Sequence, residues 1–213
     1  MGAPFGDGFL LLGHEAAGSP VGVSAKDSEV LRLIEEEELT SFTFEGLKRR
    51  VGAHPETLSR SLNRLEELNI LERADGAYRL TARGRELLDP HPLARAGGAI
   101  PLLRTMLPPT VPIEGIFANL KGRWFGQLRW LGYSDTAGDV VLKWVTADGA
   151  VQLDAKLSEG ELTIEGRLLQ GGNRTAAIRA SHELLAHISR TYAGSQSRRR
   201  LMFDLSPQPM LPN

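Results

Sequence analysis

The hydrophobic pattern changes its period part of the way along the chain. Between residues 27 and 88 apolar residues recur at helical spacing, and Leu58, Leu62 and Leu65 fall on one side of a helix. From residue 123 onward apolar and polar residues alternate, as they do in strands with one buried face. Because helices followed by strands need separate layers to cover their apolar sides, this change predicts an α+β chain of two units.

Two helices are predicted before residue 53. The first begins behind an N-cap at Ser24 or Asp27 and ends in four glutamates, residues 35–38, which we interpret as a solvated face. The second is capped by Thr43 and ends at Gly52, a residue suited to the left-handed conformation that follows many helices.

A third helix and a hairpin follow closely. Proline is favoured in a first helical turn because its missing N–H would have no partner there, so Pro55 predicts the start of the helix. Asn69 is placed to end it. A hairpin is expected over residues 70–80, because Asp75-Gly76 readily adopts the positive φ of a tight turn.

Taken in order, the elements of residues 27–88 carry a family resemblance. After the hairpin, Thr81 is expected to cap a fourth helix that buries Leu87 and Leu88. The stretches "HPETLSRSLNRLEELNILER", "ADGAYRL" and "TARGRELL" resemble the winged helix-turn-helix domain of the MarR and ArsR class of prokaryotic transcriptional regulators. One departure is Asn69-Ile70, where these families usually have glycine.

The resemblance makes the third helix a recognition helix, which lies in the major groove of DNA. Thr57, Ser59 and Arg60 occupy its first two turns, where hydroxyl groups and a guanidinium can bond to base edges or phosphates. Basic residues beside the turn and on the hairpin would meet phosphates on either side. The candidate DNA-binding residues are Lys48, Arg49, Arg50, Glu56, Thr57, Ser59, Arg60, Asn63, Arg64, Arg73 and Arg79.

Charge gives this surface little general attraction for DNA. The chain has a formal net charge of −1, and residues 44–88 contain nine basic and seven acidic residues. Binding is therefore expected to depend on geometry and on two copies acting as a homodimer, since one winged helix reads few base pairs. The same surface also suits a protein–protein adaptor that does not bind DNA, and this stays the alternative interpretation.

Residues 89–122 are predicted to be a proline-rich connector. Six prolines argue for a stiff, packed linkage. The connector holds two short apolar stretches, residues 100–107 and 113–120, and either one is a candidate for a short dimer helix. Packing between the two units is the alternative for both stretches.

Residues 123–194 are predicted to form a ββββα unit for dimerisation or effector sensing. Alternating patterns indicate strands at residues 123–131, 140–145, 151–157 and 162–168. A helix capped by Asn173 should cover the apolar face of this sheet. The residues expected on its buried stripe are Ile178, Leu185, Ile188 and Tyr192.

Three tryptophans fall in the first two predicted strands of this unit. Trp124, Trp130 and Trp144 are a candidate lining for the pocket of a small-molecule effector, or for a subunit interface. Packing in the core is the alternative, because tryptophan is an ordinary core residue.

Several classes of function are excluded or disfavoured. The chain has no cysteine, which rules out disulfides, cysteine-ligated metals and thiol catalysis. His182 and His187 are one residue too far apart for the H-E-x-x-H zinc motif, and no phosphate-binding or hydrolase motif is present. We therefore expect no enzyme activity, no metal and no cofactor.

The ends of the chain carry few structural signals. Residues 1–26 and 195–213 are expected to be a flexible arm and a C-terminal tail. The run at residues 9–12 is too short to span a membrane, so no membrane partner and a cytoplasmic location are expected. The chain as a whole is predicted to be a homodimeric regulator of transcription that binds double-stranded DNA.

Overall fold

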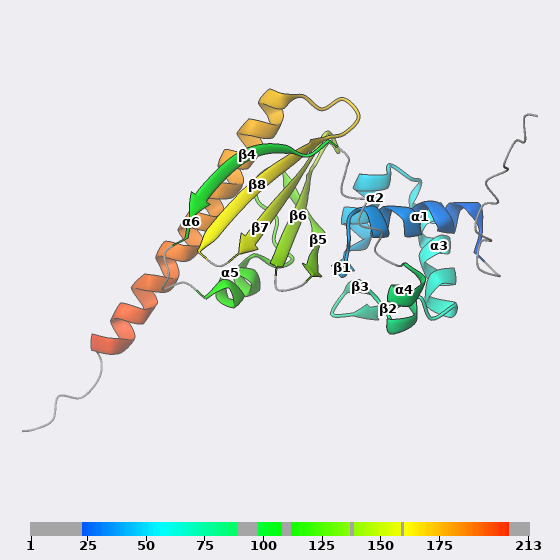
Figure 1. Cartoon of the computed structure of the whole chain (residues 1–213), viewed down its shortest axis with the longest axis horizontal. Helices are drawn as coiled ribbons and strands as arrows, with labels where there is room; N and C mark the ends of the chain where they lie inside the picture. The colour runs from blue at the N-terminus through cyan, green and yellow to red at the C-terminus, as the bar shows by residue number, and fades with distance from the viewer. Residues whose placement is uncertain (1–22, 89–97, 108–111, 137–138, 159, 205–213) are drawn as a thin grey trace, which may run out of the picture.

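The computed structural model describes residues 23–88, 98–107, 112–136, 139–158 and 160–204 (Figure 1). The predicted arm at residues 1–22 and the end of the tail at residues 205–213 lie outside the described residues. The helices are α1 (Ala25–Glu36), α2 (Phe44–Val51), α3 (Pro55–Glu67), α4 (Ala82–Leu87), α5 (Ile113–Leu120) and α6 (Arg174–Asp204). The strands are β1 (Ser41–Phe42), β2 (Leu71–Ala74), β3 (Ala77–Leu80), β4 (Ile100–Met106), β5 (Leu128–Thr136), β6 (Asp139–Thr146), β7 (Val151–Ser158) and β8 (Glu161–Leu168).

The strands of the described residues form one antiparallel sheet, in the order β2-β3-β1-β5-β6-β7-β8-β4. The N-terminal unit (residues 23–88) and the C-terminal unit (residues 98–204) share this sheet, because β1 pairs with β5. The α+β class is confirmed, but the predicted four-stranded sheet is too small. The prediction missed two strands, β1 and β4. Strand β1 has only two residues and β4 contains a proline, so neither shows a clear alternation of apolar and polar residues.

Local signals position α1 and α2 where the sequence predicts them. Ser24 caps α1 in a reciprocal capping box with Asp27, so Asp27 belongs to the first turn of the helix. Thr43 accepts a hydrogen bond from the backbone N–H of Gly46 at the start of α2. Gly52 ends α2 with a φ of 68°, as expected for a left-handed cap.

The hairpin is confirmed, and the predicted packing of the helix after it is wrong. Asp75 and Gly76 have φ of 54° and 75° at the turn between β2 and β3. Leu87, the last residue of α4, is 39% exposed, and Leu88, its C-cap, is only half-buried. The buried residue of α4 is Gly84, where a Cβ would come within 2.3 Å of the carbonyl oxygen of Ile70. Because Gly84 makes this close backbone contact, Leu87 and Leu88 lie at the edge of the N-terminal core.

The two apolar stretches of the connector belong to the C-terminal unit. The first is not a helix but β4, which pairs with β8 at the edge of the sheet. The second is α5, whose Ile116 and Leu120 lie in the same core as the sheet. Both stretches therefore pack within the C-terminal unit, and not between the two units as the alternative above supposed.

Helix α6 packs on one face of the sheet against β4, β7 and β8, although its buried stripe differs from the prediction. Ala177, Ala180 and Leu184 are buried together with Ile188, whereas Ile178 is 42% exposed. The small residues allow α6 to lie close to the sheet. The side chain of Tyr192 lies outside what the structure describes. The predicted tail is also corrected, because residues 195–204 continue α6 (Figure 1).

Two hydrophobic cores lie on opposite sides of the shared sheet. One is enclosed by α5, α6 and the strands of the C-terminal unit. The other fills the N-terminal unit and includes Leu131 of β5 and Val145 of β6. Helix α2 lies directly on β5, since a Cβ on Gly46 would come within 2.5 Å of the Cα of Leu131. Among the described helices, none has the length and apolar content that a membrane crossing requires.

Candidate nucleic-acid interface

Helix α3 separates an apolar side from a polar one. Leu58, Leu62 and Leu65 are fully buried in the N-terminal core. On the opposite side Arg60 and Asn63 are exposed, and Glu56, Thr57 and Ser59 are exposed or half-buried near the start of the helix. The helix thus presents its first turns outward, with hydroxyl, amide and guanidinium groups together on one surface.

Arg60 is the most accessible cation on this surface. Its Nη2 lies 2.5 Å from Oε1 of Glu56, and the two side chains are 69% and 64% exposed. An exposed pair with this i,i+4 spacing stabilises a helix by only about 0.3–0.5 kcal/mol. The guanidinium can therefore leave Glu56 for a stronger anionic partner at little cost.

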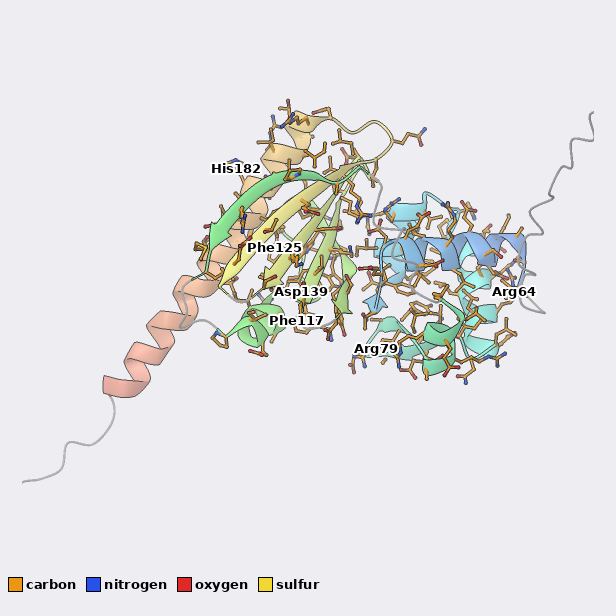
Figure 2. All side chains as sticks on the ribbon, in the orientation of Figure 1. Arg64, Arg79, Phe117, Phe125, Asp139 and His182 are labelled. Carbon is orange, nitrogen blue, oxygen red and sulfur yellow. The ribbon has the colours of Figure 1, made fainter. Side chains whose placement is uncertain are left out.

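Arg64 has a different position from the one that the sequence suggests. Its guanidinium makes hydrogen bonds to Asp27 of α1, with Nη2–Oδ1 at 2.6 Å and Nε–Oδ2 at 3.0 Å. Burial raises the pKa of Asp27, but hydrogen bonds from Arg64, Ser24 and Ser61 outweigh it and hold this pKa well below its usual range. Arg64 therefore fastens α3 to α1 (Figure 2).

The guanidinium of Arg50 likewise has its partners inside the molecule. Its Nη2 lies 2.9 Å from Oε1 of Glu37, and its Nε donates to Oε1 of Gln152 at 2.7 Å. Glu37 also accepts from Arg167 at 2.8 Å and from Gln152 at 2.7 Å. Lys143 completes this cluster, which we call the buried polar cluster: Glu37, Arg50, Lys143, Gln152, Asp154 and Arg167.

The buried polar cluster corrects the interpretation of residues 35–38 as a solvated face. The side chain of Glu37 has no exposed surface. Burial raises the pKa of Glu37, but the charges of Lys143, Arg167 and Arg50 and the hydrogen bond from Gln152 together lower it. A buried carboxylate at the C-cap of α1 thus joins the N-terminal helices to the polar face of the sheet.

Lys48 and Arg49 lie along the outside of α2. Both form ion pairs with Glu45, at 2.8 Å and 3.3 Å. The Arg49 guanidinium also lies 5.7 Å from the centre of the Trp124 ring, and Arg129 lies 4.9 Å from the same ring. These contacts turn Arg49 toward the C-terminal unit.

The hairpin supplies two further cations. Arg73 is 58% exposed, pairs with Glu66 at 3.0 Å and contacts Asn63 at 3.2 Å, which links the hairpin to α3. Arg79 pairs with Asp75 at 3.2 Å across the turn. Arg60, Asn63 and Arg73 are therefore the predicted residues that the structure brings together on one exposed surface.

This surface is close to neutral. Once Arg50 and Arg64 are set aside, the seven remaining basic residues of residues 44–88 equal the seven acidic ones in number. Electrostatic attraction to a phosphate backbone would then be small, and any binding would depend on hydrogen bonds and shape.

The three tryptophans are divided between the core and the surface. Trp130 and Trp144 pack edge to face in the C-terminal core, with ring centres 5.1 Å apart, and the indole N–H of Trp144 donates to the carbonyl of Arg123. Trp124 is 57% exposed beside Arg49. The core alternative therefore describes Trp130 and Trp144.

The two histidines of the "SHELLAH" stretch lie in different surroundings. His182 is exposed on α6, and His187 stacks on Phe125 at 4.5 Å. Burial and the nearby Arg190 lower the pKa of His187. No group of three His, Cys, Asp or Glu side chains in the described part of the chain is arranged to hold a metal ion.

Comparisons with known proteins add no relative, since no protein-family model, curated protein or solved structure matches the chain.

Proposed function

We propose that the chain binds double-stranded DNA through α3 and the β2–β3 hairpin and regulates transcription as a homodimer. One observation carries the proposal. The elements follow the order α1-β1-α2-α3-β2-β3, with only residues 52–54 between α2 and α3 and with β1 paired to β3. This is the order of a winged helix-turn-helix, in which the second helix of the turn enters the major groove.

The exposed side of α3 suits such a groove. A major groove about 12 Å wide accepts one α-helix whose first turns face the base edges. Thr57 and Ser59 can donate or accept hydrogen bonds there, and Arg60 can pair with guanine. Arg73 on the hairpin would reach the phosphates of the neighbouring DNA backbone.

A homodimer supports the proposal in two ways. Because the surface of one copy is nearly neutral, a single copy would bind weakly. Two copies double the contacts and read two half-sites. A regulator of this kind would act in the cytoplasm of a prokaryote, in keeping with the MarR and ArsR resemblance.

Titration of a labelled duplex library with the full chain at several salt concentrations tests the proposal. We expect selected sequences to bind in a salt-dependent way, and Arg60→Ala to weaken binding by about tenfold. The matched control is Arg32→Ala, since Arg32 is equally exposed and has the same i,i+4 pairing, but lies on α1. Equal binding by both variants, or no binding by the native chain, would overturn it.

The adaptor alternative is favoured by the neutrality of the same surface. If the chain is an adaptor, α3 and the hairpin bind another protein. The Arg60→Ala variant would then retain its weak, sequence-independent affinity for DNA.

A further inference from the structure

A pocket lies between the β2–β3 hairpin, α4 and β5. Its volume is about 490 Å³, within the range of sites that hold small ligands. Thr40 and Tyr133 form the wall beside β1 and β5, and the residues after α3, the hairpin and α4 form the rest. Among the described lining residues, Arg79 is the only one that also belongs to the candidate DNA-binding residues. The pocket is therefore a second site, next to the proposed DNA-binding surface.

Strand pairing places one row of side chains along this pocket. Glu72 of β2 lies opposite Arg79 of β3, Arg79 lies opposite Ser41 of β1, and Ser41 lies opposite Tyr133 of β5. Residues directly opposite in neighbouring antiparallel strands point to the same face, so this row belongs to one face of the shared sheet. Phe117 of α5 packs against the ring of Tyr133, with ring centres 5.0 Å apart. The short side chain of Ser41 leaves room between Arg79 and Tyr133.

The charged groups of the pocket are incompletely paired. The carboxylate of Glu72 has no ion-pair partner among the described residues, because Arg79 pairs instead with the 81% exposed Asp75, at 3.2 Å. Nε of Arg79 has no hydrogen-bond partner in the described part of the chain. Arg85 donates to the carbonyl oxygen of Leu80 at 3.1 Å and forms no ion pair with a residue that the structure describes. One carboxylate and one guanidinium of the lining thus lack an ionic partner, and a second guanidinium has only an exposed one.

This combination favours a ligand that carries both charges. A simple anion would suit Arg79 and Arg85 but would be repelled by Glu72, and a simple amine would be repelled by the two guanidinium groups. An α-amino acid carries a carboxylate for the guanidinium groups and an ammonium for Glu72. An exposed pair such as Arg79–Asp75 contributes about 1 kcal/mol or less, so Arg79 can turn toward a ligand at little cost.

We propose that this pocket binds an α-amino acid with an apolar side chain, whose carboxylate pairs with Arg79 and Arg85 and whose ammonium group pairs with Glu72. Hydrogen bonds between a guanidinium and a carboxylate are stronger than those between neutral groups, and two of them fix the orientation of the carboxylate. Leu80 and the ring of Tyr133 would contact the side chain of the ligand. A role as effector of the regulator rests on the proposed function; binding itself does not.

The ligand would act on the hairpin. Arg79 belongs to β3 and is one of the candidate contacts to DNA, so a carboxylate bound to it would compete with a phosphate for the same guanidinium. Tyr133, at the other side of the pocket, belongs to the C-terminal unit. Occupation of the pocket would therefore hold the hairpin against β5 and weaken binding to a duplex.

Calorimetric titration of the full chain with L-leucine, without DNA, tests the site. Two analogues each lack one of the charges: 4-methylpentanoate has no ammonium group, and 3-methylbutylamine has no carboxylate. We expect one saturable event per chain with leucine and binding at least about tenfold weaker with either analogue. No binding of leucine, or equal binding of leucine and an analogue, would overturn the site.

Two variants assign the charges of the ligand to the residues of the pocket. Arg85→Gln should weaken the binding of leucine and of 4-methylpentanoate by about tenfold, whereas Glu72→Gln should weaken that of leucine alone. The matched controls are Arg83→Gln and Glu86→Gln, since both residues are exposed on α4 and lie outside the lining. Equal weakening by the controls would overturn the site. Thermal melting confirms that each variant is folded.

Amide shifts of Ala82 and Tyr133 give a second readout, and no shift at either residue on addition of leucine would also overturn the site. Duplex binding is then measured with and without saturating leucine, which we expect to weaken it at least about threefold. Unchanged duplex affinity would overturn the effector role. Leucine binding without any DNA binding would leave the site standing and defeat the proposed function alone.

Discussion

The guanidinium of Arg64 on α3 holds the carboxylate of Asp27 on α1 through two hydrogen bonds, of 2.6 Å and 3.0 Å. Asp27 also caps α1 by accepting from the backbone N–H of Ser24 at 2.9 Å. One buried carboxylate thus fixes the start of α1 and its contact with α3. Arg64 sets the angle at which α3 presents Arg60, and this role is distinct from touching DNA.

Asp27→Asn should lower the free energy of unfolding by about 2 kcal/mol at pH 7, because the variant loses charge-assisted hydrogen bonds to Arg64. Urea denaturation measures the change. Glu29→Gln, an exposed position on the same helix, is the control and should have little effect. Equal stability of the native chain and Asp27→Asn would show that the pair contributes nothing.

The same pair predicts a dependence on pH. Since the pKa of Asp27 is lowered in the folded chain, its contribution is complete above the unfolded pKa of about 4 and is lost as the pH falls below it. The difference in stability between the native chain and Asp27→Asn should therefore shrink between pH 5 and roughly pH 2. A difference that grows on acidification would contradict this sign.

Under the proposed function, Glu56→Gln should strengthen binding to DNA by roughly twofold to fivefold at low salt, because it removes a negative charge from the proposed contact surface and frees Arg60. Fluorescence anisotropy with a labelled duplex measures the affinity. Glu29→Gln changes the net charge equally and should alter affinity less. If the two variants behave alike, the effect is one of net charge and α3 is not the contact.

Lys143→Met should destabilise the chain by about 3 kcal/mol, because it leaves Asp154 and Glu37 buried with one cation fewer. Lys156→Met is the matched comparison, since Lys156 also pairs with an aspartate on the same face but is 47% exposed. Its loss should cost less than about 1 kcal/mol. Chemical denaturation at neutral pH distinguishes the two, and equal losses would mean that the buried polar cluster is no stronger than a surface pair.

Gly132→Ala should weaken the connection between the two units. A Cβ at this position would come within 2.2 Å of the carbonyl oxygen of Ser41 and 2.9 Å of the Cα of Phe42, where β1 pairs with β5. We expect a loss of roughly 2 kcal/mol from this overpacking. Hydrogen exchange should show faster exchange at the backbone amides of the β1–β5 pair.

Gly115→Ala serves as its control. Gly115 lies within α5, where a Cβ meets only the ring of Pro112 at 3.3 Å. Replacing a helical glycine should be neutral or stabilising by up to about 1 kcal/mol. Similar losses in both variants would mean that the β1–β5 contact is not the cause.

Some features of the candidate site followed from short-range patterns and others did not. The leucines of α3 predicted its buried side, and hence its polar side, because both depend only on helical spacing. The roles of Arg50 and Arg64 were not predicted, since a basic residue looks the same in sequence whether its partner is DNA or a carboxylate. The polar residues Lys143, Gln152 and Asp154 in neighbouring strands were the available signal, and all three are buried.

The sequence by itself determined the helices of the N-terminal unit, their caps and the hairpin, because these depend on residues a few positions apart. Only the tertiary structure decided that β1 pairs with β5, that Arg64 forms an ion pair with Asp27, and that Glu37 is buried against Arg167. These partners are separated by 37 residues for Arg64 and Asp27 and by 130 for Arg167 and Glu37. Periodicity shows which face of an element is buried, but the partner that covers it is chosen by packing of the whole chain.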